Sequence, residues 1–143
     1  MGSLTAVNSI IVLSVAGVFP QGQQLSGYSA DDVFDVDQID VAETSMGIDG
    51  LLSGGLIYTV IPWSISLQAN SPSNDVFDQW YAYQKTVGDV AVASMQVALP
   101  GLGYKWVYSN GFLKKYSVAP NVKKIVQPRK YTIEWNTIGV SPM

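Results

Sequence analysis

Hydrophobic and polar residues alternate in several segments of this 143-residue chain with the period of two that is typical of β-strands. Clean alternation predicts strands at 90–99 and 131–138, and three shorter segments between them are also predicted as strands, namely 104–108, 112–118 and 122–126. Two further stretches, 8–18 and 56–61, are apolar at nearly every position. A strand of this kind is apolar on both faces, so its outer face is expected to meet a helix or another subunit.

Glycine, proline and polar residues that are typical of turns predict the connections between these strands. Residues 20–30 are polar, uncharged and contain glycine, which favours a flexible loop, whereas the glycines within 44–55 are typical of a loop or hairpin. Asn110-Gly111 predicts a tight hairpin between 104–108 and 112–118. Pro62 lacks a backbone donor, so the strand at 56–69 is expected to lie at an edge or to be bulged there.

The acidic stretch 31–43 keeps a clean alternation only in its first part. Its phase changes at Ile39, where a bulge or the end of a strand is expected.

One helix is predicted, at residues 71–88. Ser71 is expected to cap it with Pro72 in the first helical position, and Ser73 is an alternative cap. Gly88 is expected to end it. Helical spacing places one set of apolar side chains on a single face: Val76, Trp80, Tyr83 and Val87.

Seven or eight strands and one helix indicate a mainly β fold, in which a small β-barrel or sandwich carries a flanking α-helix. The chain length fits a single domain, residues 1–143, and no interdomain linker interrupts the pattern.

Charge adds an expectation of assembly. Residues 1–84 contain nine acids and no lysine or arginine, whereas the remainder contains all eight basic residues and two acids. Charged residues make up only 13% of the chain, against about 25% in an ordinary globular domain. Either the protein is embedded in a membrane or partners cover much of its surface. Ser14 and Gly17 interrupt the longest apolar stretch, which is too short to span a bilayer.

Composition excludes several chemistries. The chain has no cysteine and no histidine, so thiolate catalysis, His-dependent triads and histidine zinc sites are impossible. Calcium binding is disfavoured because the acidic run lacks the glycine that a calcium loop needs. The acids of that run therefore form either a solvated face or the lining of a channel, and they are Asp31, Asp32, Asp35, Asp37, Asp40 and Glu43.

Basic pairs in the second half have two possible interpretations. Interleaved with aromatic residues, they resemble a single-strand nucleic-acid platform, but eight basic residues and an acidic overall balance argue against it. The favoured interpretation is contact with acidic segments of a neighbouring subunit. The candidate interface residues are Lys114, Lys115, Lys123, Lys124, Arg129 and Lys130.

The order of segments also carries a family resemblance. An Asp31-Asp32-Val33-Phe34 strand precedes the Gly47-Ile48-Asp49-Gly50 turn, a long apolar strand from Ile57 to Leu67, and then Ser71-Pro72-Ser73-Asn74 at the start of a helix. In this order the chain resembles the small tail-tube proteins of contractile-tailed bacteriophages. The resemblance covers most of residues 5–138, and Ser71-Pro72-Ser73-Asn74 is its most specific part.

The resemblance implies a structural, non-enzymatic virion protein with no catalytic residues, cofactor or metal. Its subunits would form hexameric rings that stack head to tail into a hollow conduit for the genome. The partners implied are further copies of the chain and the sheath, baseplate and tail-terminator proteins. DNA would pass through without specific binding, no membrane would be involved, and assembly would take place in the host cytoplasm.

Within such a tube, Asp31, Asp35 and Asp37 are the candidate lumen-lining residues, since like charge repels DNA phosphates. Two alternatives remain open. One is the tube of a related injection machine, either a type VI secretion system or a phage-tail-like bacteriocin. The other is a ligand-binding or carbohydrate-binding β-barrel, which would use the 16 aromatic residues as a pocket lining.

Overall fold

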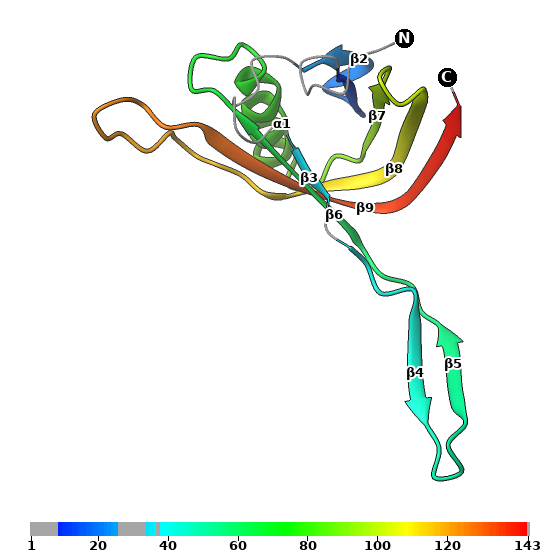
Figure 1. Cartoon of the computed structure of the whole chain (residues 1–143). Coiled ribbons are helices and arrows are strands. Elements are labelled where there is room, and N and C mark those ends of the chain that lie inside the picture. The colour runs from blue at the N-terminus through cyan, green and yellow to red at the C-terminus, as the bar shows by residue number, and fades with distance from the viewer. Residues whose placement is uncertain (1–8, 26–33, 37, 143) are drawn as a thin grey trace.

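The computed structural model describes residues 9–25, 34–36 and 38–142 (Figure 1). Within them, helix α1 is Asn74–Val87. The strands are β1 (Ile10–Val15), β2 (Phe19–Gln24), β3 (Phe34–Val36), β4 (Ala42–Met46), β5 (Leu52–Leu56), β6 (Ile61–Leu67), β7 (Ala93–Leu99), β8 (Tyr104–Lys115) and β9 (Arg129–Pro142).

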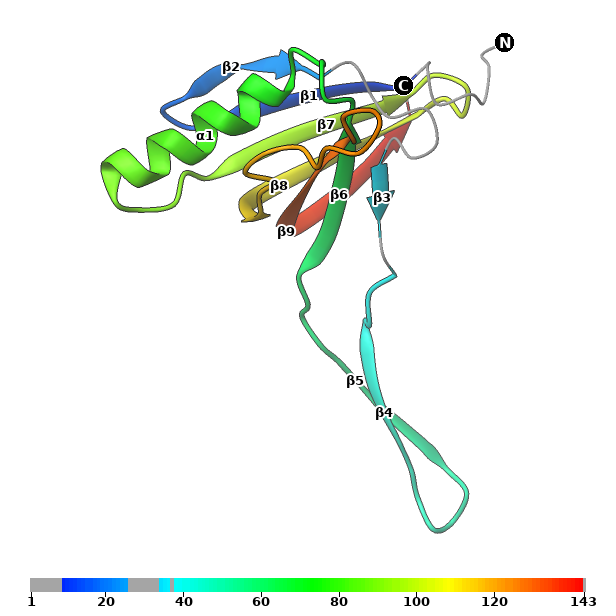
Figure 2. The same ribbon diagram turned by 90° about the vertical axis from the view of Figure 1, so that its left-hand side faces the viewer.

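Seven of the strands form one antiparallel sheet in the order β2-β1-β7-β8-β9-β6-β3. The sheet is strongly curved, and α1 lies against one of its faces (Figures 1 and 2). The mainly β class with one flanking helix is therefore confirmed. The sheet does not close into a barrel, because β2 and β3 at its two edges do not pair with each other.

The core lies between this face of the sheet and α1. Alternate residues of the strands point into it, which gives β6 the fully regular pattern of a buried and a half-buried residue in turn. Its largest members are aromatic: Trp63, Trp80, Trp135, Tyr131 and Phe77. Phe77 stacks on Tyr131 with ring centroids 4.1 Å apart, and this contact seats the helix on β9.

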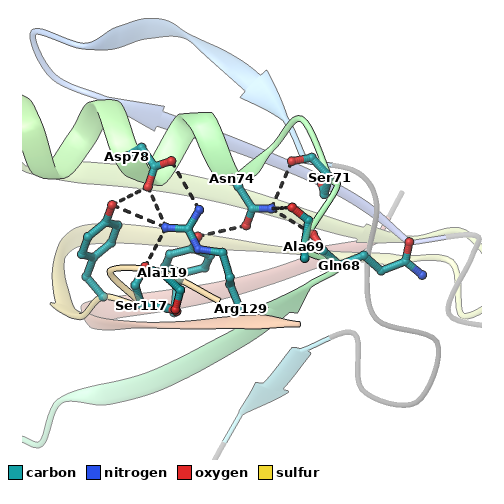
Figure 3. Close-up of polar contacts among 10 residues, drawn as sticks. Gln68, Ala69, Ser71, Asn74, Asp78, Ser117, Ala119 and Arg129 are labelled. Carbon is teal, nitrogen blue, oxygen red and sulfur yellow. Dashed lines mark hydrogen bonds and ion pairs between the residues drawn. The ribbon is translucent and has the colours of Figure 1, made fainter. Parts of the chain in front are cut away.

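Helix α1 begins three residues after the predicted cap. Ser73, the alternative cap, occupies the cap position, and the Ser71 hydroxyl accepts a hydrogen bond from the Ser73 amide over 3.2 Å. The Asn74 side-chain amide donates to the carbonyl oxygens of Gln68 and Ser71 (Figure 3). The Tyr131 hydroxyl donates to the Asn74 Oδ1 atom over 2.9 Å. Gly88 ends the helix in the left-handed conformation, as predicted.

The predicted apolar face of the helix is correct only in its first half. Val76 and Trp80 are buried, and Phe77, which the spacing argument left out, is fully buried between them. Tyr83 and Val87 are exposed, because the end of the helix extends past the core. The core-facing side therefore includes adjacent residues rather than a single line of side chains.

The predicted hairpin at Asn110-Gly111 is wrong. β8 continues through these two residues without reversing the chain. Asn110 takes a left-handed conformation with φ 54° at a bulge, where β8 has one extra residue against β7. The Trp135 ring lies over Gly111, so closely that a Cβ atom there would be 2.3 Å from the ring. The dipeptide thus makes room for a core tryptophan instead of reversing the chain.

Three other expectations need correction. The loop predicted at 20–30 is strand β2 up to Gln24, and residues 26–30 lie outside the described part of the chain. The strand predicted at 122–126 is a single bridge between Val122 and Val126 within an irregular loop. Pro62 pairs with Glu134 in unbroken register, so it produces no bulge. β6 is not an edge strand, because it lies between β9 and β3. In the described residues its pairing with β3 stops at Trp63, so Pro62 lies just beyond that pairing.

The hairpin predicted within 44–55 is confirmed, and it leaves the body of the molecule. β4 and β5 pair only with each other and extend far beyond the sheet (Figures 1 and 2). Residues 40–60 are called the arm below.

Candidate assembly surfaces

The arm is an amphipathic two-stranded ribbon. Register places Met46 opposite Leu52 and Ala42 opposite Leu56, so these side chains share one face. Glu43 opposite Gly55 and Ser45 opposite Ser53 make the other face polar. One face of a ribbon that extends into solvent is therefore apolar.

A tight turn closes the arm at its tip. The Gly47 amide donates to the Leu51 carbonyl oxygen over 2.8 Å, and the Leu51 amide donates to Asp49 Oδ1 over 3.1 Å. Gly50 has φ +83°, a value that L side chains rarely adopt. The tip presents Ile48, whose side chain is fully exposed.

The apolar side chains of the arm are not covered by the rest of the subunit. Met46, Leu51, Leu52 and Leu56 are each about two-thirds exposed or more, and Tyr58 is 92% exposed. An isolated two-stranded hairpin is at best marginally stable in water, and contiguous exposed apolar surface is typical of an interaction site. The arm therefore has the properties of an interface that a partner completes.

The face of the sheet opposite α1 is polar near β3, β6 and β9. Phe34 stacks on Trp63 at 5.5 Å, so the neighbouring Asp35 lies on the opposite face, where it is exposed. Ser64, which pairs with Asp35, hydrogen-bonds Thr132 over 2.9 Å. Asp31 and Asp37, the other candidate lumen residues, lie outside the described residues.

A second surface surrounds the long connection between β8 and β9. Residues 114–130 are called the basic loop, and they contain six basic residues and no acid. Five of the six candidate interface residues are exposed there: Lys114, Lys115, Lys123, Lys124 and Lys130. Lys114 makes a long contact of 3.8 Å with Glu134. Exposed apolar side chains lie among the lysines, namely Val118, Val122 and Ile125.

Arg129 does not share this exposure, since its side chain is 9% exposed and turned inward. Its guanidinium donates to both carboxylate oxygens of Asp78 on α1, over 2.8 and 3.3 Å, and to the Ser117 carbonyl oxygen over 2.6 Å (Figure 3). Tyr116 donates to the same carboxylate and stacks on Tyr81. Arg129 therefore anchors the basic loop to the helix, and the five lysines remain the exposed candidates.

The electrostatics of this anchor favour its charged form. Burial alone would raise the pKa of Asp78, but the hydrogen bonds from Arg129 and Tyr116, together with the Arg129 charge, lower it below its usual value. Burial and the hydrogen bond to Asp78 raise the pKa of Tyr116. The ion pair thus persists at neutral pH.

A mainly apolar recess of about 260 Å³ lies between β3 and parts of β7, β8 and β9. Its lining is Phe34, Val36, Val97, Leu99, Trp106, Tyr108 and Ile138. Sugar sites need several convergent polar groups, and this lining supplies few. The recess therefore gives little support to carbohydrate binding.

Two negative findings concern the described residues. No group of three acidic, histidine or cysteine side chains is placed there to hold a metal ion. In the same part of the chain, no helix is both long and apolar enough to cross a membrane.

Sequence reasoning located the hairpin but not the arm. Consecutive apolar residues at 56–61 indicated a missing partner, and Leu56, Tyr58 and Val60 are indeed exposed at the base of the arm. The local pattern holds no information on whether a hairpin folds back on its sheet or extends away. The buried role of Arg129 was also missed, because its partner Asp78 lies 51 residues away.

Comparison with known protein families gives one match over nearly the whole chain. The family described as "Tail fiber protein gp32" matches residues 3–139. No curated protein matches the chain.

Solved structures provide relatives of the fold. A chain of the extended sheath-tube complex of the extracellular contractile injection system PVC has a TM-score of 0.63 at 11% identity, over 99% of this chain and 93% of that one. A chain of the PVC sheath/tube terminator also scores 0.63 at 11% identity, over 99% and 98%. The tube-terminating cap of the anti-feeding prophage scores 0.62 at 10% identity, over 100% and 93%. At these identities the likeness concerns the fold.

Proposed function

The chain belongs to the family described as tail fiber protein gp32, and from this premise we propose that it is a structural subunit of a tail tube. In this proposal the subunits assemble into rings, and the rings stack into a hollow conduit. The protein performs no catalysis and binds no cofactor.

The observation that carries the proposal is the arm. Its apolar face belongs to a ribbon that pairs with no other strand of the described chain, and Leu52 and Leu56 remain largely exposed on it. Burying apolar surface contributes about 25 cal/mol per Å², so a second subunit that covered this face would stabilise both partners. A monomer that binds a ligand in its body does not require an exposed apolar ribbon of this kind.

The fold relatives support a tube rather than an external fiber. The printed descriptions of these structures refer to a sheath-tube complex, a sheath/tube terminator and a tube-terminating cap. A likeness of 0.62 to 0.63 over nearly the full length of both chains relates the whole domain to them. The family description also refers to a tail, and its word "fiber" defines the competing outcome of the test below.

We place the face of the sheet opposite α1 toward the lumen. Asp35 is exposed on it, and its neighbours across the strands are the hydroxyl side chains of Ser64 and Thr132. Around Asp35 the face therefore offers DNA phosphates no strong attraction, and Lys130 lies at its far end, opposite Ser66. Asp31 and Asp37 belong to the same proposal as its remaining carboxylates.

The finer parts of the proposal follow from the tube. Six subunits form each ring, the rings stack head to tail, and sheath, baseplate and terminator proteins bind the tube. The protein then belongs to the tail of the virion and assembles in the host cytoplasm. A tube of a secretion system or bacteriocin has the same subunit requirements, and the presence of DNA in purified particles distinguishes these alternatives.

Electron microscopy and sedimentation of the purified protein test the assignment. Wild-type protein is expected to form rings or tubes, and Leu52→Ser/Leu56→Ser is expected to remain as folded single subunits, because it removes the apolar face of the arm. Val87→Ser is the matched control, since Val87 is an exposed apolar residue at the end of α1. It is expected to assemble like wild type.

Three results would contradict the proposal. Wild-type protein that stays monomeric at high concentration would remove self-assembly. Solid trimers or rods without a channel would favour the fiber. Assembly of the Leu52→Ser/Leu56→Ser variant at the wild-type concentration would show that the arm is not an interface.

A further inference from the structure

We propose that the arm of one copy docks on the basic loop of the next copy, so that these two surfaces form the head and the tail of the assembly contact. The inference rests on the proposed function and names the partner surface of the arm. Four observations support it: placement, charge, apolar complementarity and the preformed state of the basic loop.

The two surfaces lie at opposite ends of the same pair of strands. The arm leads into β6 at Ile61, whereas the basic loop leads into β9 at Arg129, which pairs with Leu67 at the other end of β6. Six residue steps of about 3.4 Å separate the two ends by roughly 20 Å. The arm and the loop also leave the body in different directions (Figure 1). They therefore cannot meet within one subunit.

This placement matches the geometry of an open assembly. When two complementary surfaces lie on different parts of a subunit, each copy binds the next heterologously, and the contact repeats until a ring closes or a filament grows. A contact from one end of the β6–β9 pair to the other propagates along the direction of these strands.

The charges of the two surfaces are opposite and unmixed. The arm contains Asp40, Glu43 and Asp49 and no basic residue, whereas the basic loop contains no acid. Arg129 is already neutralised by Asp78, which leaves the five exposed lysines, and of these Lys114 makes a long contact with Glu134. Complementary charge of this kind fixes register and disfavours arm-to-arm contact between copies.

Apolar side chains accompany the charges on both sides. Met46, Leu52 and Leu56 line one face of the arm, and exposed Val118, Val122 and Ile125 lie among the lysines. Stable interfaces combine an apolar centre with a polar rim. Each surface supplies both components.

The basic loop is held in shape before a partner arrives. Its beginning is fixed by Arg129 through the Ser117 carbonyl oxygen, and its end by the Gln127 amide, which donates to the Asn121 carbonyl oxygen over 2.8 Å. The Tyr116 ring stacks on Tyr81 at 4.4 Å. A preformed surface loses little conformational entropy on binding, so the loop is the receptor and the arm is the inserted element.

Reciprocal charge reversal tests the contact. Lys123→Glu/Lys124→Glu is expected to raise the critical concentration for assembly about tenfold or more, because two attractive pairs become repulsive. Glu43→Lys/Asp49→Lys is expected to do the same, and a protein with all four changes is expected to recover most of the loss. Lys85→Glu/Lys105→Glu makes the same change of charge elsewhere and is the control. All the changed positions are exposed except Lys105, which is half-buried, and circular dichroism checks that each variant is folded.

Cross-linking identifies the contact directly, because the natural chain has no cysteine. Asp49→Cys protein and Lys123→Cys protein, assembled as a one-to-one mixture and treated with a short bismaleimide, are expected to give a covalent dimer of the two variants. The mixture kept below the assembly concentration is expected to give none.

The outcomes separate the two proposals. Wild-type protein that never assembles overturns the proposed function, and the docking inference with it. Tubes in which the charge reversal has no effect, or in which the arm cross-links to another surface or to a different protein, overturn only the docking inference.

Discussion

At the scale of single residues, the feature with the widest consequences is the carboxylate of Asp78. It accepts hydrogen bonds from Arg129 and Tyr116, and Arg129 also binds the Ser117 carbonyl oxygen. One residue of the helix thereby holds Tyr116, which lies 38 residues later in the chain, near the beginning of the basic loop. The basic loop owes its shape to this contact.

Replacing this carboxylate has a pH-dependent consequence. The pKa of Asp78 is lowered in the folded state, so its stabilising effect is present above the unfolded pKa of about 3.9 and is lost as the pH falls through the folded value. The Asp78 side chain is 39% exposed, so solvent screens part of this effect. Asp78→Asn is therefore expected to reduce the free energy of unfolding by about 1 kcal/mol at pH 7. The difference from wild type should shrink at pH 3, as measured by urea unfolding.

Asp75→Asn is the control for this experiment, because Asp75 lies exposed in the first turn of the same helix. It is expected to have a much smaller effect at pH 7. A deficit of Asp78→Asn that is equal at pH 7 and pH 3 would contradict the role assigned to the ionised carboxylate.

At the scale of elements, the bulge in β8 determines how the sheet accommodates its largest side chain. Gly111 pairs directly with Trp135, and the indole ring lies over the glycine backbone. β8 has one extra residue against β7 at this point, and Asn110 accommodates it in a left-handed conformation that asparagine tolerates better than most residues. The bulge and the position of the Trp135 ring therefore depend on each other.

A methyl group at this position tests that arrangement. Gly111→Ala is expected to destabilise the subunit by about 1–3 kcal/mol, because the Cβ atom overlaps the Trp135 ring and forces it out of place. Gly139→Ala in β9 is the matched control, since a Cβ atom there meets nothing within 4 Å. Thermal unfolding of the two variants makes the comparison, and equal midpoints would contradict the packing argument.

At the scale of the whole molecule, the subunit divides into a packed body and an arm that depends on others. The body has a continuous core under α1, whereas β4 and β5 have only each other. Local stability follows the number of buried apolar contacts, so the two parts should open independently in the isolated subunit.

Hydrogen exchange is expected to reveal this division. In the isolated subunit the amides of β4 and β5 should exchange much faster than those of β6 and β9, and in the assembled tube their protection should rise toward that of the body. Mass spectrometry of the same peptides in both states makes the measurement. The β9 peptide is the internal control, and an arm already protected in the single subunit would contradict the division.

Much of the fold was predictable because it depends on local chemistry. Alternation placed β6, β7 and the first part of β9, Gly88 ended the helix, and the glycines near the tip of the arm indicated a hairpin. Each of these features depends on neighbouring residues alone, through strand periodicity or a φ value that only glycine adopts freely. The apolar run at 56–61 likewise indicated a missing partner, and Leu56, Tyr58 and Val60 are exposed at the base of the arm.

The predictions that failed concern contacts between residues far apart in the chain. Asn110-Gly111 has the local signal of a turn, and only the ring of Trp135 across the strand makes it a bulge. A charged residue such as Arg129 is usually exposed, and only the ion pair with Asp78 on α1 makes it a buried anchor. The identity and order of the residues were enough to establish a mainly β, histidine-free and cysteine-free subunit with separated charge, because strand periodicity and charge position can be read along the chain. The tertiary structure decided which of those charges remain free and that the hairpin leaves the body, because both depend on which surfaces the packed core leaves uncovered.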